Sequence, residues 1–149
     1  MAWPSLAIII LDQISKLAIV HLLPLHESVS VTRFFNLVHV RNRGMAFGLM
    51  NQTNNDICFY LLTAASLGAV ILLLVWFFKL KKDDNRIALG LGLILGGAVG
   101  NLIDRLRFRE VIDFLDLYVG QYHWPSFNVA DSAITAGTFW LAIILILKR

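Results

Sequence analysis

Acidic side chains lie inside or beside segments of this sequence that are otherwise strongly apolar. Asp104 ends one apolar run, Asp131 begins the next, and Asp113 lies in the stretch between them. An ionised side chain within a membrane segment costs at least about 2.5–3.5 kcal/mol, so such residues are functional candidates. Two carboxylates that share a water can divide the work of hydrolysis: the ionised one takes the water's proton, and the protonated one polarises the scissile carbonyl. Proximity enforces this division, because like charges that close cannot both ionise cheaply.

Spacing alone favours Asp104 and Asp131 as the pair, because each lies at the end of an apolar segment and follows an asparagine, Asn101 or Asn128, by three residues. The same acids also fit a second class of protein, a membrane carrier in which acidic side chains relay protons. Other hydrolase chemistry fits less well. The sequence has no Ser-x-x-Lys or Gly-x-Ser-x-Gly nucleophile motif, and its four histidines are not spaced as metal ligands. We therefore expect no metal and no other cofactor.

Two further charged residues interrupt the first apolar segment. Asp12 and Lys16 are four residues apart, which places them on one face of a helix and allows them to pair. We interpret them as an ion pair that pins this helix to its neighbours, with a direct chemical role as the alternative. They also argue against a cleaved signal peptide, whose apolar core has no charges.

The elements that must position these residues are four membrane helices. The chain has 149 residues, of which 58% are hydrophobic and 15% charged, and its mean hydropathy is +0.70. A soluble domain is about half apolar and about a quarter charged. Apolar runs long enough to cross a bilayer predict helices at about 3–23, 57–78, 87–104 and 129–147. We expect a single, mainly α membrane domain over residues 1–149.

The segment between the first two helices is predicted to form a small β-sheet. Residues 28–40 are rich in β-branched and aromatic side chains with partial alternation, and a turn-prone Arg-Asn-Arg-Gly follows. In the third helix, Gly92, Gly96 and Gly100 recur at four-residue spacing, which lets another helix backbone approach closely.

Basic residues predict the orientation in the membrane. The link at residues 79–86 (KLKKDDNR) has four basic residues, and the chain ends in Lys148–Arg149. The positive-inside rule then places both termini in the cytoplasm and residues 24–56 and 105–128 outside, although these outer segments also contain six arginines. The basic residues form no stripe with interleaved aromatic residues, so we expect no nucleic-acid partner.

Four blocks of the sequence occur in order over essentially the whole chain. They are Asp12-Gln13-Ile14-Ser15-Lys16; Asn42-Arg43-Gly44-Met45-Ala46-Phe47-Gly48; the run from Gly96 to Arg105 (GGAVGNLIDR) that continues to Val111-Ile112-Asp113-Phe114; and Phe127-Asn128-Val129-Ala130-Asp131. Together these blocks resemble those of the bacterial lipoprotein signal peptidases, also called signal peptidase II, a family of membrane aspartyl peptidases.

The resemblance implies a specific activity. The family cleaves the signal peptide of prolipoproteins just before a cysteine that carries a diacylglyceryl group. It works at the outer face of the bacterial cytoplasmic (inner) membrane, among the membrane lipids, without a metal, and it is the target of globomycin. We therefore expect lipid-modified prolipoproteins as substrates and globomycin-type peptides as inhibitors.

The resemblance also implies the roles of individual residues. The resemblance assigns Asp113 and Asp131 as the catalytic pair, and it assigns Asp104 to the residues that support the site. The residues that bind substrate or support the site are Asn42, Gly44, Asn101, Asp104, Arg105, Asn128, Ala130, Asp12 and Lys16. One position departs from the family pattern, because Arg109 stands where the family often has glycine.

Overall fold

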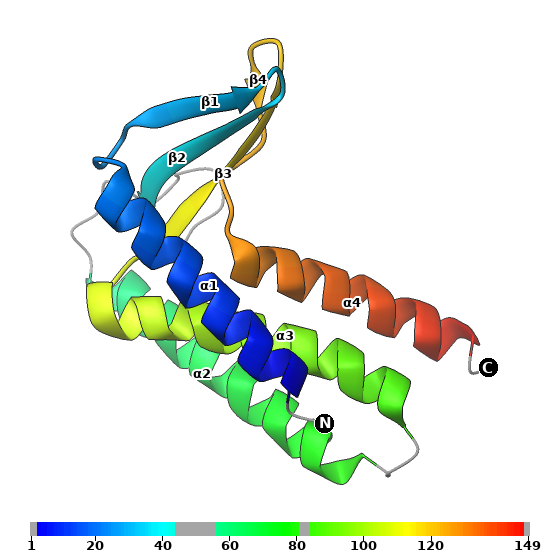
Figure 1. Cartoon of the computed structure of the whole chain (residues 1–149). Coiled ribbons are helices and arrows are strands. Elements are labelled where there is room, and N and C mark those ends of the chain that lie inside the picture. Colours follow the sequence, from blue (N-terminus) through cyan, green and yellow to red (C-terminus); the bar gives the residue numbers. More distant parts are fainter. Residues whose placement is uncertain (1–2, 44–55, 81–83, 148–149) are drawn as a thin grey trace.

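A bundle of four long helices forms most of the computed structural model, which describes residues 3–43, 56–80 and 84–147 (Figure 1). The helices are α1 (Trp3–Leu22), α2 (Asp56–Lys79), α3 (Asn85–Phe108) and α4 (Val129–Leu147). Each contains a stretch long and apolar enough to cross a membrane. The predicted fold class, a mainly α membrane protein with four spanning helices and a small sheet, is confirmed.

Helix α3 lies at the centre of the bundle and packs against each of the other three helices. It continues to Phe108, so Arg105 belongs to the last turns of the helix and not to the segment after it. Basic side chains at this end, Arg105 and Arg107, complement the negative end of the helix dipole.

Glycines allow α3 to approach α1 and α4 closely. A Cβ added at Gly100 would lie 2.6 Å from Oδ2 of Asp12 in α1, and one added at Gly97 would collide with the backbone carbonyl of Ala130 in α4. A Cβ added at Gly96 would lie 2.8 Å from the backbone oxygen of Ser5. The predicted role of the small residues in α3 is therefore confirmed, because the α3 backbone lies close to both α1 and α4 at these positions.

The β-sheet has four antiparallel strands, in the order β1 (Ser28–Thr32), β2 (Phe35–Asn42), β3 (Val111–Val119) and β4 (Tyr122–His123). Figure 1 shows the sheet at one end of the bundle, which we call the sheet end. The sequence predicted strands only between the first two helices, whereas β3 and β4 follow α3. The prediction missed β3 because its first four residues, 111–114, are all buried, which hides the alternation typical of a strand.

Strand β3 connects the sheet to the start of α4. Asn42, at the end of β2, pairs with Val111, the first residue of β3. The backbone oxygen of Phe127 accepts hydrogen bonds from the amides of Phe114 and Leu115, at 3.0 and 2.8 Å. The residue before Asn128 is therefore fixed against β3, and α4 begins beside the sheet.

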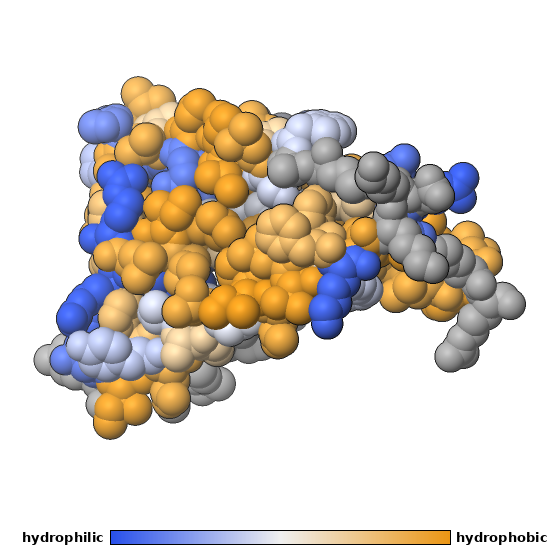
Figure 2. Space-filling view, turned by 90° about the horizontal axis from the view of Figure 1, so that it is seen from below, coloured by the Kyte–Doolittle hydropathy of each residue, from blue (hydrophilic) through white to orange (hydrophobic). Residues whose placement is uncertain are grey.

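Apolar side chains cover much of the outside of the bundle. Large exposed apolar residues occur along α1, α2 and α4, while the central helix α3 is mostly buried, and Figure 2 shows apolar residues over most of the described surface seen from below. This distribution is expected where lipid, and not water, surrounds the helices.

Candidate active site

Asp131 belongs to a reciprocal cap at the start of α4. Asn128 precedes the helix, and its Oδ1 accepts a hydrogen bond from the backbone amide of Asp131 at 2.9 Å. In return, Oδ2 of Asp131 accepts a hydrogen bond from the backbone amide of Asn128 at 3.3 Å. This is the arrangement of a capping box, with asparagine and aspartate in the two capping positions. The sequence Asn-Val-Ala-Asp thus both starts the helix and fixes the Asp131 carboxylate.

Asn128 also contacts Asp113, so this one residue hydrogen-bonds to both carboxylates, through its backbone amide to Asp131 and through its side chain to Asp113. Its Nδ2 donates to Oδ1 of Asp113 at 2.8 Å, while Nδ2 of Asn42 donates to the other oxygen, Oδ2, at 3.0 Å. Asn42 comes from β2 and Asp113 from β3, and pairing of these two strands brings them together. Asp113 is buried, and Asn128 is completely so.

The environment of Asp113 favours its neutral form. Burial is the largest cause and the charge of Asp131 the next, and together they raise the pKa of Asp113 to about 7. Hydrogen bonds from Asn42 and Asn128 and the charge of Lys16 act in the opposite direction. The shift also indicates that Asp113 and Asp131 lie close enough to interact electrostatically.

Asn101 links Asp131 to the buried lysine of α1. Its Nδ2 donates to Oδ1 of Asp131 at 2.8 Å. Its Oδ1 accepts hydrogen bonds from Nζ of Lys16 at 3.0 Å and from Nδ2 of Asn128 at 3.2 Å. The amide therefore has one defined orientation, in which its NH₂ group faces the carboxylate.

The buried side chain of Lys16 lies between two carboxylates, one from α1 and one from α3. Its Nζ is 2.7 Å from Oδ2 of Asp12 and 2.7 Å from Oδ2 of Asp104, and all three side chains are at most 2% exposed. The predicted pairing of Asp12 with Lys16 is present. Asp104 engages this lysine, which distinguishes it from the two acids around Asn128.

The two carboxylates beside Lys16 also fix the backbone near the site. Oδ1 of Asp12 accepts a hydrogen bond from the amide of Ala130 at 2.9 Å, which connects α1 to α4. Oδ2 of Asp104 accepts one from the amide of Ile112 at 3.2 Å, which connects α3 to β3. These backbone positions immediately precede Asp131 and Asp113, respectively. The ion cluster thus holds both acids through their neighbours.

The remaining predicted site residues differ in their placement. The backbone oxygen of Asn101 accepts a hydrogen bond from Nη1 of Arg105 at 3.4 Å, and the charges of Asp131, Asp104 and Asp113 all act on this guanidinium. Ala130 is completely buried where α3 and α4 meet. Gly44 lies outside the described residues.

One supporting residue was missed by the sequence interpretation. Nε2 of Gln13 donates to Oδ1 of Asp104 at 2.9 Å and lies 3.2 Å from Oδ2 of Asp12. It is the second residue of the Asp-Gln-Ile-Ser-Lys block, where only the charged residues were considered. Its polarity within an apolar helix was the available signal.

Asp116, the second acid of β3, belongs to a separate group of side chains. Its carboxylate accepts a hydrogen bond from Nδ2 of Asn36 at 2.9 Å and lies 2.9 Å from Nδ1 of His123. Within the described ranges, no group of three His, Cys, Asp or Glu side chains is placed to hold a metal ion.

Comparison with known proteins agrees with the four sequence blocks. The chain matches the family model described as "Signal peptidase (SPase) II" over residues 5–147. It is 45% identical over 138 residues to the lipoprotein signal peptidase of Syntrophotalea carbinolica, covering 91% of this chain and 84% of that one. It is 49% identical over 136 residues to that of Desulforapulum autotrophicum, covering 89% and 83% of the two chains.

Two solved structures, each described as a bacterial membrane enzyme, have the same fold. One has a TM-score of 0.79 at 30% identity and covers 96% of this chain and 90% of its own. The other has a TM-score of 0.76 at 32% identity and covers 97% and 85%. The chain therefore belongs to the signal peptidase II family.

Proposed function

We propose that this membrane protease removes the signal peptide of lipoproteins by an aspartic mechanism in which Asp113 and Asp131 activate one water molecule. Membership of the family makes it a lipoprotein signal peptidase. The observation that carries the mechanism is the position of Asn128, which hydrogen-bonds to both carboxylates where the sheet meets the helix bundle. The alternative of a proton-relaying carrier has no comparable observation in its favour.

The two carboxylates take different roles. Asp113, with its pKa raised to about 7, is the acid that keeps a proton and donates a hydrogen bond to the scissile carbonyl. Asp131 lies in the first turn of α4 and accepts hydrogen bonds from Asn101 and from the amide of Asn128, which suit an ionised carboxylate. The proposed mechanism needs one proton on the pair, and two such close carboxyl groups titrate as a unit.

The proposed reaction conserves its protons. Asp131 takes a proton from the water while the water oxygen attacks the scissile carbonyl carbon, and Asp113 stabilises the oxygen of the tetrahedral intermediate. The proton on Asp131 then passes to the leaving nitrogen as the C–N bond breaks. The products are a carboxyl group on the signal peptide and a free amine on the residue after the cut.

The substrate explains why such a site lies at a membrane boundary. We infer that the scissile bond precedes a cysteine bearing a diacylglyceryl group, whose acyl chains partition into the bilayer at about 0.8 kcal/mol per buried CH₂ group. This anchoring delivers the bond to the boundary where Asp113 and Asp131 lie. The positive-inside rule places the lysine-rich link at residues 79–86 and both termini in the cytoplasm. The sheet end of the bundle then faces outward.

The supporting residues have corresponding roles in this proposal. Asn42, Asn101 and Asn128 orient the two acids, and Arg105 contacts a carbonyl group of the substrate. A globomycin-type peptide would occupy the same site and inhibit the enzyme. Asp12, Lys16 and Asp104 hold the backbone from which the catalytic residues project.

Substitution of the acids tests the mechanism. We expect Asp113→Asn and Asp131→Asn each to lower cleavage of a purified lipidated precursor by at least about a thousandfold, because the two groups act as one unit. Asparagine keeps the shape of the side chain, so the variants should remain folded in detergent. Asp116→Asn is the matched control, since Asp116 is also buried on β3 but binds Asn36 and His123.

The control should retain wild-type activity. Near wild-type cleavage by the Asp113 or Asp131 variant would show that the catalytic pair is assigned incorrectly and would reopen the carrier alternative.

A further inference from the structure

Arg109 adopts a backbone conformation that disfavours an arginine. It ends α3 with φ 60° and ψ 10°, in the left-handed region, and its amide donates to the backbone oxygen of Arg105 at 2.9 Å. Glycine is the usual residue at this position of a helix end, because it has no side chain to clash. A non-glycine residue here is strained, and such strain persists where the side chain has a compensating role.

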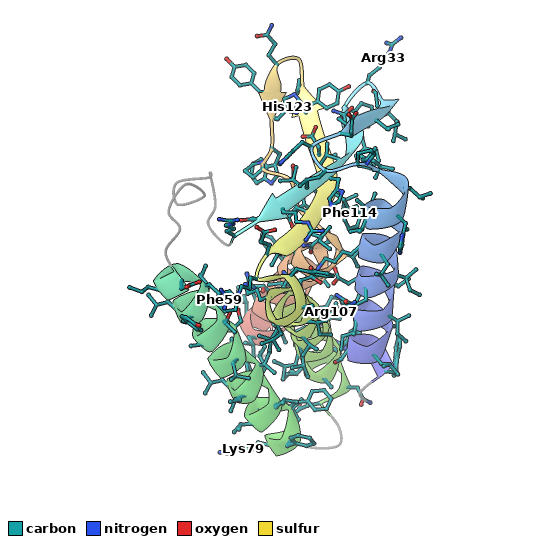
Figure 3. The ribbon with its side chains drawn as sticks, turned by 90° about the vertical axis from the view of Figure 1, so that its left-hand side faces the viewer. Arg33, Phe59, Lys79, Arg107, Phe114 and His123 are labelled. Atoms are coloured by element: carbon teal, nitrogen blue, oxygen red, sulfur yellow. The ribbon has the colours of Figure 1, made fainter. Side chains whose placement is uncertain are left out.

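The side chain of Arg109 binds the first turn of α2. Its Nη1 lies 2.8 Å from Oδ1 of Asp56, and its guanidinium carbon lies 5.0 Å from the centroid of the Phe59 ring. Asp56 and Phe59 are three residues apart and therefore share one face of the helix. Figure 3 shows Phe59 at the sheet end of α2, opposite Lys79.

This end of α2 has little apolar packing to hold it. Among the residues of α2 whose side chains are described, none before Val70 is buried. Val70 belongs to an apolar cluster with Leu95 and Leu102 of α3, and Phe77 packs in a second cluster further along. Apolar contacts therefore fix the middle and far end of α2, while Arg109 adds an ion pair and a cation–π contact at its start.

The residue after Arg109 contacts the strand that supports the candidate site. Oε1 of Glu110 lies 2.8 Å from Nε of Arg43, which follows Asn42 at the end of β2. Asn42 in turn hydrogen-bonds to Asp113. The turn between α3 and β3, residues 109–110, therefore connects the first turn of α2 to β2 and β3, the strands that position Asp113.

We propose that Arg109 is a positioning residue that holds the first turn of α2 against this turn and so sets the approach of a membrane-anchored substrate to Asp113 and Asp131. The inference rests on the proposed function, because it concerns the lipid-anchored precursor. Arg109 acts through α2 and contacts no reacting atom. Its loss should therefore weaken substrate binding more than it slows the chemical step.

The decisive variant is Arg109→Gly, which removes the side chain and also relieves the backbone strain. We expect its melting temperature to equal or exceed that of the wild type, so that lost activity cannot be attributed to unfolding. We expect KM for a lipidated precursor to rise about three- to tenfold, with kcat within about twofold. Arg33→Gln is the charge-matched control, because Arg33 lies at the far tip of the sheet (Figure 3) and should leave KM unchanged.

A double-mutant cycle assigns the effect to the contact with α2. Asp56→Asn should raise KM as Arg109→Gly does, and the double variant should be no worse than the poorer single variant, because both remove the same interaction. Additive effects, or an equal rise in KM for Arg33→Gln, would overturn the inference.

Amide hydrogen exchange provides a readout that does not depend on cleavage. We expect exchange in residues 56–66 to quicken several-fold in Arg109→Gly and Asp56→Asn and to remain unchanged in Arg33→Gln. Unchanged exchange in the first two variants would disprove the contact. If the wild-type protein fails to cleave the precursor while exchange responds as expected, the proposed function fails and the positioning of α2 by Arg109 stands.

Discussion

At the scale of single residues, the pKa of Asp113 is determined by interactions of opposite effect. Two asparagine amides donate to its two oxygens, which favours the charged carboxylate, while burial and the charge of Asp131 favour the neutral acid. Burial and repulsion dominate, so the pKa of Asp113 rises from 3.8 to about 7. A carboxylic acid that keeps its proton near neutral pH can donate a hydrogen bond to a carbonyl.

This pKa predicts the pH dependence of cleavage. Because the proposed mechanism needs Asp113 protonated, kcat/KM should decline as the pH rises through about 7. A series of initial rates for the purified enzyme between pH 5 and pH 9, with a lipidated precursor, would measure it. A rate that keeps increasing up to pH 9 would contradict the assignment of Asp113 as the acid.

The same pKa predicts a change in stability. Between pH 3.8 and about 7 the folded protein holds a proton on Asp113 that the unfolded chain has lost. The free energy of unfolding should therefore fall as the pH rises in this window, at up to about 1.4 kcal/mol per pH unit from this group. Asp113→Asn removes this contribution, so thermal unfolding of that variant should depend less on pH over the same range.

Sequence reasoning on single residues found the acids but could not choose between them. Spacing favoured Asp104 with Asp131, since both end an apolar segment. Asp104 instead pairs with Lys16, and Asp113 reaches Asn128 because β3 pairs with β2 and Phe127 binds β3. These contacts join residues distant in sequence, so local spacing carries no signal for them, and only the family motifs selected Asp113.

At the scale of elements, the close approach of α3 to α4 positions the cap that holds Asp131. The backbone of α3 at Gly97 lies against the carbonyl of Ala130, one residue before Asp131. Asn101, one turn further along α3, then reaches Asp131 at 2.8 Å. The helix separation and the hydrogen-bonded network therefore depend on each other.

We expect Gly97→Ala to force α3 and α4 apart, because the new methyl group would overlap the Ala130 carbonyl. Overpacking of this kind costs about 1–3 kcal/mol. Cleavage should fall together with stability, as measured by thermal unfolding in detergent and by precursor turnover. The control is Gly68→Ala in α2, where an added Cβ meets no atom within 4 Å.

The control should be neutral or stabilising by up to about 1 kcal/mol, because alanine is the better helix former. Equal effects of the two substitutions would show that the α3–α4 contact is not tightly packed.

Elements differed in how well the sequence predicted them. The four helices were predicted from the length of their apolar runs. This is a local property of the sequence, because a segment that crosses lipid must be both apolar and long enough to span it. Strand β3 was missed because its residues near the site are buried on both faces. The end of α3 was placed too early because the arginines in its last turn are typical of a polar loop. In both cases tertiary contacts outweigh the local pattern.

At the scale of the whole molecule, the candidate active site lies at the junction of a lipid-facing bundle and a sheet. The exposed apolar residues of the helices fix the depth of the protein in the bilayer, and thereby the depth of Asp113 and Asp131. In the proposed function, the substrate is held at the same boundary by its acyl chains. Much of the recognition then comes from the shared membrane and not from side-chain pockets.

This arrangement predicts tolerance of the sequence that follows the lipidated cysteine. We expect purified precursors with varied residues after the cysteine to be cleaved at rates within about tenfold of one another, whereas a precursor without the diacylglyceryl group should be a much poorer substrate. Initial rates at equal precursor concentrations would measure both effects. A roughly thousandfold spread among the downstream variants would contradict the prediction.

The buried lysine of α1 has a consequence for biogenesis. Lys16 and Asp12 can neutralise each other within one helix, but their second partners, Asp104 and Ala130, come from α3 and α4, which are synthesised later. Until those helices arrive, α1 holds an incompletely satisfied ion pair in hydrocarbon, at a cost of a few kcal/mol. We therefore expect α1 to leave the translocon for the lipid as part of an assembled bundle, and not as an independent helix.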